Sequence, residues 1–128
     1  MEGLTQLEQS VLNKLLAGEN PTLAALRAQA EGARLKSREN TGAGFFCYFD
    51  VPSEAKPVGE GSFHLGDVDA VIPPLAHGAG FVLFITSGKL DRLEGYSYDE
   101  PWPADIQKFE LRYQGDHRQL NLPPVADR

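Results

Sequence analysis

The stretch that decides the fold runs from Gly78 to Pro103 and reads GAGFVLFITSGKLDRLEGYSYDEPWP. Its first part contains consecutive large apolar residues, Phe81 to Ile85, a run that is typical of a strand buried in a sheet. Ser87 and Gly88 then give a turn signal, and a strand of mixed polarity follows. The stretch therefore predicts a β-hairpin in the core, and its last part, rich in aromatic residues and proline, is the best candidate for a recognition surface.

Two further features of the sheet can be predicted downstream of this turn. Leu90 and Leu93 would fall on opposite faces of a regular strand, so we expect a β-bulge near Asp91 and Arg92. The last clear strand is predicted over Ile106 to Tyr113, where charged residues alternate with apolar ones. The apolar residues that we expect to point inward from this strand are Phe109, Leu111 and Tyr113.

The first 33 residues predict a helical hairpin. Thr5 and Glu8 have the spacing of a capping box, and leucine and valine follow at helical intervals up to Leu16. Gly18 ends this helix. The pair Asn20-Pro21 then gives a cap followed by proline at the first helical position, which begins a second helix that ends near Gly32. Because the linker is short, we expect the two helices to fold back against each other and to lay a shared apolar stripe on the sheet.

From residue 34 onward the apolar period changes toward two, which indicates strands. Residues 44–51 form a strand with aromatic residues on both faces, so we expect both faces to be partly covered. A connector rich in proline and glycine follows over 52–61. Short strands are then predicted over Ser62–Leu65 and Val68–Ile72, joined as a hairpin by a turn at Gly66-Asp67.

Together these elements predict an α+β fold, in which an N-terminal helical hairpin packs on one face of a mainly antiparallel sheet. At 128 residues the chain has the length of one domain, 1–128. Within it we expect the helical hairpin over 1–33 and the sheet over 34–115. Residues 116–128 have no period and predict a loosely held tail.

The charge balance bears on the kind of partner. The net charge is −6, and the excess of acids lies in residues 41–128, which carry thirteen acidic and seven basic residues. Lysine and arginine cluster only at 34–38, so nucleic acid is not a predicted ligand. An acidic surface favours encounter with a basic partner, although it also serves simply to keep a protein soluble.

The sequence gives no sign of export or of membrane insertion. No apolar run approaches the roughly 20 residues that cross a bilayer, and Met1 to Gly18 lacks the features of a signal peptide. We therefore expect a cytoplasmic protein. Cys47 is the only cysteine, which excludes a disulfide within the chain and fits a reducing compartment.

The residues capable of chemistry are few and scattered. His64, His77 and His117 have no metal-ligand spacing, and the carboxylates of Asp67 and Asp69 are too few for a calcium loop. Cys47 lies within an aromatic strand, where a thiol behaves as a small hydrophobe. No phosphate-binding, dinucleotide-binding or nucleophile motif occurs. We therefore predict no catalytic residue, no metal and no cofactor.

The end of the opening stretch differs from the rest of the chain, because it combines aromatic, acidic and proline residues. Two prolines flank the only tryptophan, which limits the backbone freedom that binding would remove. Tyrosine and tryptophan are common anchors of protein interfaces, and they also bind cations. Trp102 can equally close one end of the core. The predicted partner-binding residues are Tyr96, Tyr98, Asp99, Glu100, Trp102 and Asp105.

Several motifs spread along the chain resemble those of a family of small uncharacterised bacterial proteins. They include the patterns T-G-x-G-F-F and L-E-G-Y-x-Y…W-P, and they lie at Leu23–Gln29, Ser37–Phe46, Val51–Pro52, Gly78–Phe81, Leu93–Tyr98 and Trp102–Pro103. The resemblance covers most of the chain and implies a bacterial, cytoplasmic setting. Some members are similar in type to the immunity proteins that neutralise bacterial toxins, which implies binding rather than catalysis.

Three functional hypotheses follow from the sequence. The first is a non-enzymatic protein-binding module, such as an immunity-like inhibitor, that engages a basic protein. The second is an enzyme or small-ligand binder with a pocket between helices and sheet, which would use His64, His77 or Asp67. The third is a structural subunit of a homo-oligomer, joined through the edge of the strand at Ile106–Tyr113.

Overall fold

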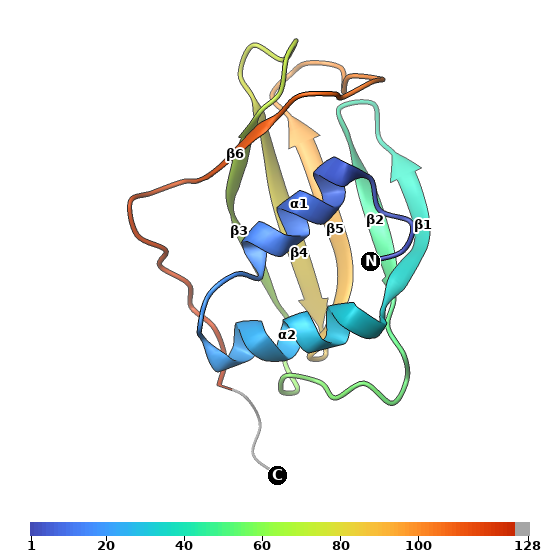
Figure 1. Ribbon diagram of the computed structural model, residues 1–128, viewed down its shortest axis with the longest axis vertical. Helices are drawn as coiled ribbons and strands as arrows, with labels where there is room; N and C mark the ends of the chain where they lie inside the picture. Colours follow the sequence, from blue (N-terminus) through green and yellow to red (C-terminus); the bar gives the residue numbers. More distant parts are fainter. Residues whose placement is uncertain (125–128) are drawn as a thin grey trace.

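The computed structural model describes residues 1–124, and it has the α+β arrangement that the sequence predicts. Six antiparallel strands form one sheet in the order β1-β2-β5-β4-β3-β6. Both helices precede the strands and lie over the same face of the sheet (Figure 1). The elements are α1 (Gln6–Leu15), α2 (Pro21–Gly32), β1 (Arg34–Asn40), β2 (Gly44–Asp50), β3 (Phe63–Val71), β4 (Ala79–Thr86), β5 (Lys89–Ser97) and β6 (Glu110–Tyr113).

The helices begin where their capping residues predict. Thr5 and Glu8 form the complete capping box of α1, with the Glu8 amide donating to Thr5 Oγ1 and the Thr5 amide donating to Glu8 Oε1. The side chain of Asn20 caps α2 by accepting from the Thr22 amide, and Pro21 occupies the first turn. α1 contacts β3 and β4, whereas α2 contacts β5, so the two helices pack on different strands of the sheet and not mainly against each other, as their short linker had predicted.

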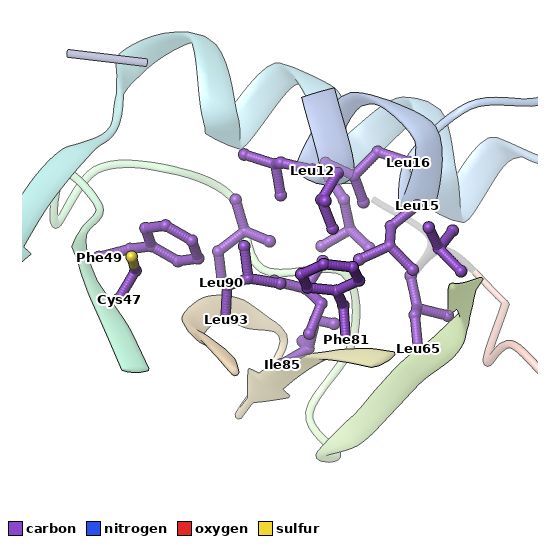
Figure 2. Close-up of a cluster of buried hydrophobic side chains, with 14 of the residues drawn as sticks. Leu12, Leu15, Leu16, Cys47, Phe49, Leu65, Phe81, Ile85, Leu90 and Leu93 are labelled. Carbon is purple, nitrogen blue, oxygen red and sulfur yellow. The ribbon is translucent and has the colours of Figure 1, made fainter. Parts of the chain in front are cut away.

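The core lies between the helices and the sheet, where leucines of α1 meet the inward residues of β3, β4 and β5 (Figure 2). Phe81 at the centre of β4 is fully buried, as the apolar run predicts. Successive side chains of a strand point to opposite faces, so the odd-numbered residues of β4 fill this core and the even-numbered ones point away from it. The buried side chains shown include Leu12, Leu15, Leu16, Cys47, Phe49, Leu65, Ile85, Leu90 and Leu93.

The hairpin in the opening stretch is confirmed. β4 and β5 pair antiparallel and are joined by Ser87 and Gly88, which have φ angles of 51° and 77°. Two successive positive φ angles match the twist of a tight hairpin turn. The predicted bulge is also present, because Phe84 pairs with Arg92 and Ile85 with Leu90, which leaves Asp91 unpaired.

The predicted hairpin over 62–72 is wrong, because this segment is the single strand β3. Both halves of β3 pair with β4, and the register shifts between Leu65 and Val68. Gly66 and Asp67 therefore form a bulge within one strand rather than a turn between two. A turn signal of glycine and aspartate also fits a bulge, and the choice depends on the neighbouring strand.

The strand predicted over Ile106–Tyr113 is shorter than expected and begins only at Glu110. Its partner is β3, and their last pair is Val71 with Glu110. Beyond that point the β3 chain reaches Pro73 and Pro74, which have no N–H groups to continue the ladder. Phe109, Leu111 and Tyr113 nevertheless pack against the core, as predicted.

Two segments at the sides of the sheet were not foreseen in detail. β1 is a charged edge strand that pairs only with β2 in the sheet, and its residues showed no apolar pattern. The segment after residue 115 is not loosely held over 116–124, because Arg118 binds Asp67 and the Thr22 hydroxyl donates to the Pro123 carbonyl oxygen. The end of the predicted tail, 125–128, lies outside the described residues.

Candidate binding surface

Within residues 1–124, no helix lies over the second face of the sheet (Figure 1). This face nevertheless carries aromatic side chains. On β2, Phe45 and Cys47 point to the buried core, so Phe46 and Tyr48 point to the opposite face. The same alternation applies to β4 and β5. We define the helix-free face by its large side chains, Phe46, Tyr48, Val71, Val82, Phe84, Tyr96 and Tyr98.

The large apolar groups that are most exposed in the chain belong to the helix-free face. Val71 is 41% exposed and Tyr98 is 44% exposed, and every other large hydrophobic residue in the range 1–124 is buried or partly buried. A one-sided antiparallel sheet normally carries polar residues on its wet face. Large aromatic side chains on a wet face, here among charged ones, are a mark of a candidate interaction site.

Aromatic and charged groups alternate across this face. The rings of Phe46 and Tyr48 stack with their centroids 6.1 Å apart. The Arg92 guanidinium lies 4.0 Å from the centroid of Phe84 and donates to the Asp91 carboxylate at 2.7 Å. The cation–π contact and the ion pair together position the Arg92 guanidinium over the Phe84 ring.

Carboxylates border the aromatic side chains. Glu39 lies opposite Phe46 on β1, and Tyr48 Oη donates to its carboxylate at 3.3 Å. Paired positions also place Glu94 beside Val82. Further acids on the same face are Asp69, which pairs with Gly80, and Glu110, which pairs with Val71; the accompanying arginines are Arg92 and Arg112.

The structure brings two of the predicted binding residues together on this face. The rings of Tyr96 and Tyr98 stand at 82° to each other with centroids 5.6 Å apart. Burial, with smaller contributions from Tyr98 and from the charges of Asp69 and Glu94, raises the pKa of Tyr96 to about 12. The Tyr96 hydroxyl therefore stays protonated at neutral pH.

Trp102 lies away from this pair, on the helix side of the sheet. Its ring packs edge-on against Phe45, whose side chain is buried in the core, at a centroid distance of 5.4 Å. It lines a hollow together with Glu8 and Arg38 near the start of α1. Trp102 thus closes one end of the core, and it does not share a surface with Tyr96.

The three predicted acids also have different positions. Glu100 joins the segment after β5 to the β3–β4 loop, because its carboxylate accepts from the amides of Ala76 and His77 at 3.0 and 3.2 Å. These bonds, that of Ala76 first, lower the pKa of Glu100. Asp99 is exposed in a bend with a φ angle of 62°, next to Tyr98, and Asp105 is exposed and accepts from Gln107.

An ion pair between the buried Glu8 and the partly exposed Arg38 lies under the start of α1, beside a hollow of about 470 Å³. Arg38 donates to both carboxylate oxygens of Glu8, at 2.9 and 2.5 Å, and the Glu8 side chain is only 5% exposed. Burial raises the pKa of Glu8, but hydrogen bonds from Arg38 and the Thr5 amide outweigh it, and the net shift is downward. Burial raises the pKa of the adjacent Cys47 to about 12, so this thiol is an unreactive core group.

The Glu8→Gln variant tests this pair. We expect it to lose about 2 kcal/mol of unfolding free energy at pH 7, because Arg38 loses its charged partner. A lowered pKa in the folded state gives stability above the unfolded pKa of about 4.3, and this stability is lost as the pH falls through the folded value. Urea unfolding should therefore show a gap from wild type at pH 7 that shrinks toward pH 3.

The matched control is Glu19→Gln, which changes an exposed acid in the linker between the helices. Its unfolding free energy should stay within about 0.5 kcal/mol of wild type at both pH values. A Glu8→Gln gap that does not change with pH would contradict the ion-pair account.

The predicted alternative site is only partly assembled. His64 and Asp67 line one open hollow of about 570 Å³ beside the first half of β3. His77 lies in the β3–β4 loop, and His117 lies in the segment after β6. The Asp67 carboxylate already accepts hydrogen bonds from Arg118 Nε and Nη2, at 2.7 and 2.9 Å. The His64 ring packs against the Phe84 ring, with the two centroids 6.2 Å apart. Within residues 1–124 no group of three or more potential metal ligands occurs, and no helix is long and apolar enough to cross a membrane.

Sequence reasoning did not place Phe46, Tyr48 and Phe84 in a binding surface. Their signal was present, since the strand at 44–51 has aromatic residues on both sides and the run 81–85 is apolar at every position. Two short helices can cover only one face of a six-stranded sheet. The other face of these strands therefore has no helix over it within residues 1–124, and Phe46, Tyr48 and Phe84 on that face are only partly buried.

Comparison of the chain with known protein-family models, with curated proteins and with solved structures finds no match in any of the three.

Proposed function

We propose that this chain is a non-enzymatic protein-binding module whose helix-free face engages a basic protein. One observation carries the proposal: a sheet face without a helix carries aromatic side chains where solvent contact favours polar ones. A few hot-spot residues supply most of the binding energy of typical interfaces, and tyrosine and tryptophan are enriched among them. An immunity-like inhibitor, as the motif resemblance implies, is a protein of this kind.

The charge of the face argues for a basic partner. Acids surround the aromatic groups, and one of the arginines there, Arg92, already forms an ion pair with Asp91. The part of the chain that contributes most of this face, residues 41–128, holds the whole excess of negative charge. Complementary charge accelerates encounter and disfavours acidic partners, including nucleic acids.

The test is capture followed by reconstitution. The purified chain is immobilised, proteins are captured from an extract of the organism that encodes it, and the captured protein is purified and titrated calorimetrically against the chain. We expect a protein with a basic surface, and an affinity that decreases with added salt. Capture alone does not support the proposal, because the surface must also be located.

Two double variants locate the surface. Asp69→Lys with Glu94→Lys reverses two charges on the helix-free face, and Glu19→Lys with Glu31→Lys makes the same change in net charge at exposed positions on the helix side. We expect the first to weaken binding at least about tenfold and the second to have little effect. Equal weakening by both would show that net charge alone steers the partner, and would refute the proposed surface.

The two alternatives each rest on a narrower observation. The hollow that His64 and Asp67 share supports a small-ligand site, but a proton-transfer role for Asp67 would require breaking its bonds to Arg118. The homo-oligomer hypothesis requires two copies to pair through the sheet edge at β6, and this strand offers only four residues for pairing. Recovery of only further copies of this chain in the capture experiment would favour the homo-oligomer.

A further inference from the structure

The two tyrosines of the helix-free face form a corner that rests on a glycine. A Cβ placed on Gly80 would lie 2.5 Å from Tyr96 Oη and 2.6 Å from Cζ, so the outer end of the ring lies directly on the backbone of β4. Only glycine permits this close approach. Tyr98 stands nearly perpendicular to that ring and is 44% exposed. The two rings thus form a corner in which Tyr98 is exposed to solvent and Tyr96 is partly buried.

Carboxylates lie at the sides of this corner. Gly80 pairs with Tyr96 on one side and with Asp69 on the other, so the Tyr96 hydroxyl extends across β4 toward Asp69. Glu94 lies two residues before Tyr96 on the same face. The negative charges of Asp69 and Glu94 also contribute to the raised pKa of Tyr96, after the larger effect of burial.

The same face shows what such a combination of groups binds. Arg92 lies over the Phe84 ring while Asp91 accepts from its guanidinium, so one arginine is already held by an aromatic ring and a carboxylate together. Within residues 1–124, no arginine or lysine lies over Tyr96 or Tyr98. Arg112 pairs with Asp69 across the strands, but no ion pair forms between them in this range.

From this geometry we propose that the corner formed by Tyr96, Tyr98, Asp69 and Glu94 is a binding site for an arginine side chain of the partner. The inference rests on the proposed function and names the group that the face recognises. A guanidinium can stack on one ring while its N–H groups reach the two carboxylates, whereas the compact charge of lysine makes fewer directed contacts. Gln114 donates to Oδ1 of Asp69, which leaves the second carboxylate oxygen for this contact.

A defined peptide tests the site without knowledge of the partner. Hexa-arginine is titrated into the ¹⁵N-labelled full chain at low salt, with hexa-lysine and the neutral isostere hexa-citrulline as comparison peptides. We expect hexa-arginine to shift the amide signals of Gly80, Tyr96 and Tyr98, to bind more tightly than hexa-lysine, and to bind far more tightly than hexa-citrulline.

Variants then separate the corner from the rest of the face. Tyr98→Leu and Asp69→Asn should each weaken hexa-arginine binding about fivefold, since each removes one contact with the cation. Tyr48→Leu, a matched change elsewhere on the helix-free face, should alter it less than twofold. An unchanged affinity for Tyr98→Leu, an equal loss for Tyr48→Leu, or equal binding of hexa-lysine would overturn the arginine site.

The outcomes for the site and for the proposed function are distinguishable. If a basic protein binds the helix-free face but its affinity is insensitive to Tyr98→Leu, the arginine site is wrong and the binding module stands. If hexa-arginine binds at the corner but no basic protein is recovered and reconstituted, the site stands and the proposed function fails.

Discussion

The Gly44→Ala variant is expected to lose about 3 kcal/mol of unfolding free energy. A Cβ on residue 44 would lie 1.8 Å from the carbonyl oxygen of Gly95 and 2.9 Å from the Cα atom of Tyr96. Both contacts are with the backbone of the neighbouring strand β5, so no side-chain rotation relieves them. Strands β2 and β5 would have to separate, and overpacking of this kind typically costs 1–3 kcal/mol or, against backbone, somewhat more.

The effect is measured by urea unfolding at pH 7, with Gly61→Ala as the control. Gly61 has no neighbouring atom within 4 Å of a Cβ position, so its variant should stay within about 0.5 kcal/mol of wild type. Gly44 also pairs with Tyr96, and Gly44→Ala should therefore weaken hexa-arginine binding as well. Equal stability of the two variants would refute the close strand contact that positions the tyrosine corner.

The Arg118→Met variant should lose about 2–3 kcal/mol of unfolding free energy. Arg118 donates to both oxygens of Asp67 and to the carbonyl oxygens of Leu15 and Ala17, and its guanidinium lies 4.5 Å from the Tyr113 ring centroid. The side chains of Arg118 and Asp67 are 18% and 21% exposed, so the lost bonds are not simply replaced by water. Methionine keeps much of the packing and removes the charge.

Arg112→Met is the matched control, because Arg112 is an exposed arginine on β6. Thermal unfolding should give a clearly lower midpoint for Arg118→Met and a midpoint close to wild type for Arg112→Met. Equal midpoints for the two variants would show that the segment after β6 does not brace α1 against β3.

The parts of the fold that could be predicted from the sequence are those that local interactions decide. The capping box at Thr5, Pro21 at the start of α2 and the turn at Ser87-Gly88 each act within a few residues, and all three are confirmed. The limits of β3 and β6 depend on pairing between distant strands. Gly66-Asp67 is a bulge because β4 pairs with β3 both before and after it, and β6 begins only at Glu110 because its partner β3 ends at Val71, shortly before Pro73.

The candidate site likewise depends on tertiary structure that the local sequence does not decide. Tyr96 and Trp102 are close in sequence, but the chain bends between them, and the Trp102 amide donates to the Gly42 carbonyl oxygen on the way to the helix side. Adjacent residues therefore reach different faces. In contrast, Phe46, Phe84 and Tyr96 share a face only because β2, β5 and β4 are neighbours, and that strand order is a tertiary property.

The most direct test of the account is to find which face of the sheet the partner covers. In the complex with the reconstituted basic protein, a soluble paramagnetic reagent reports the solvent access of individual protons by NMR. We predict that relaxation of the ring protons of Tyr48, Tyr96 and Tyr98 decreases on binding, while that of the Met1 and Ala30 methyl protons beside the helices does not change. Protection of the helix side with unchanged relaxation at these tyrosines would contradict the central claim.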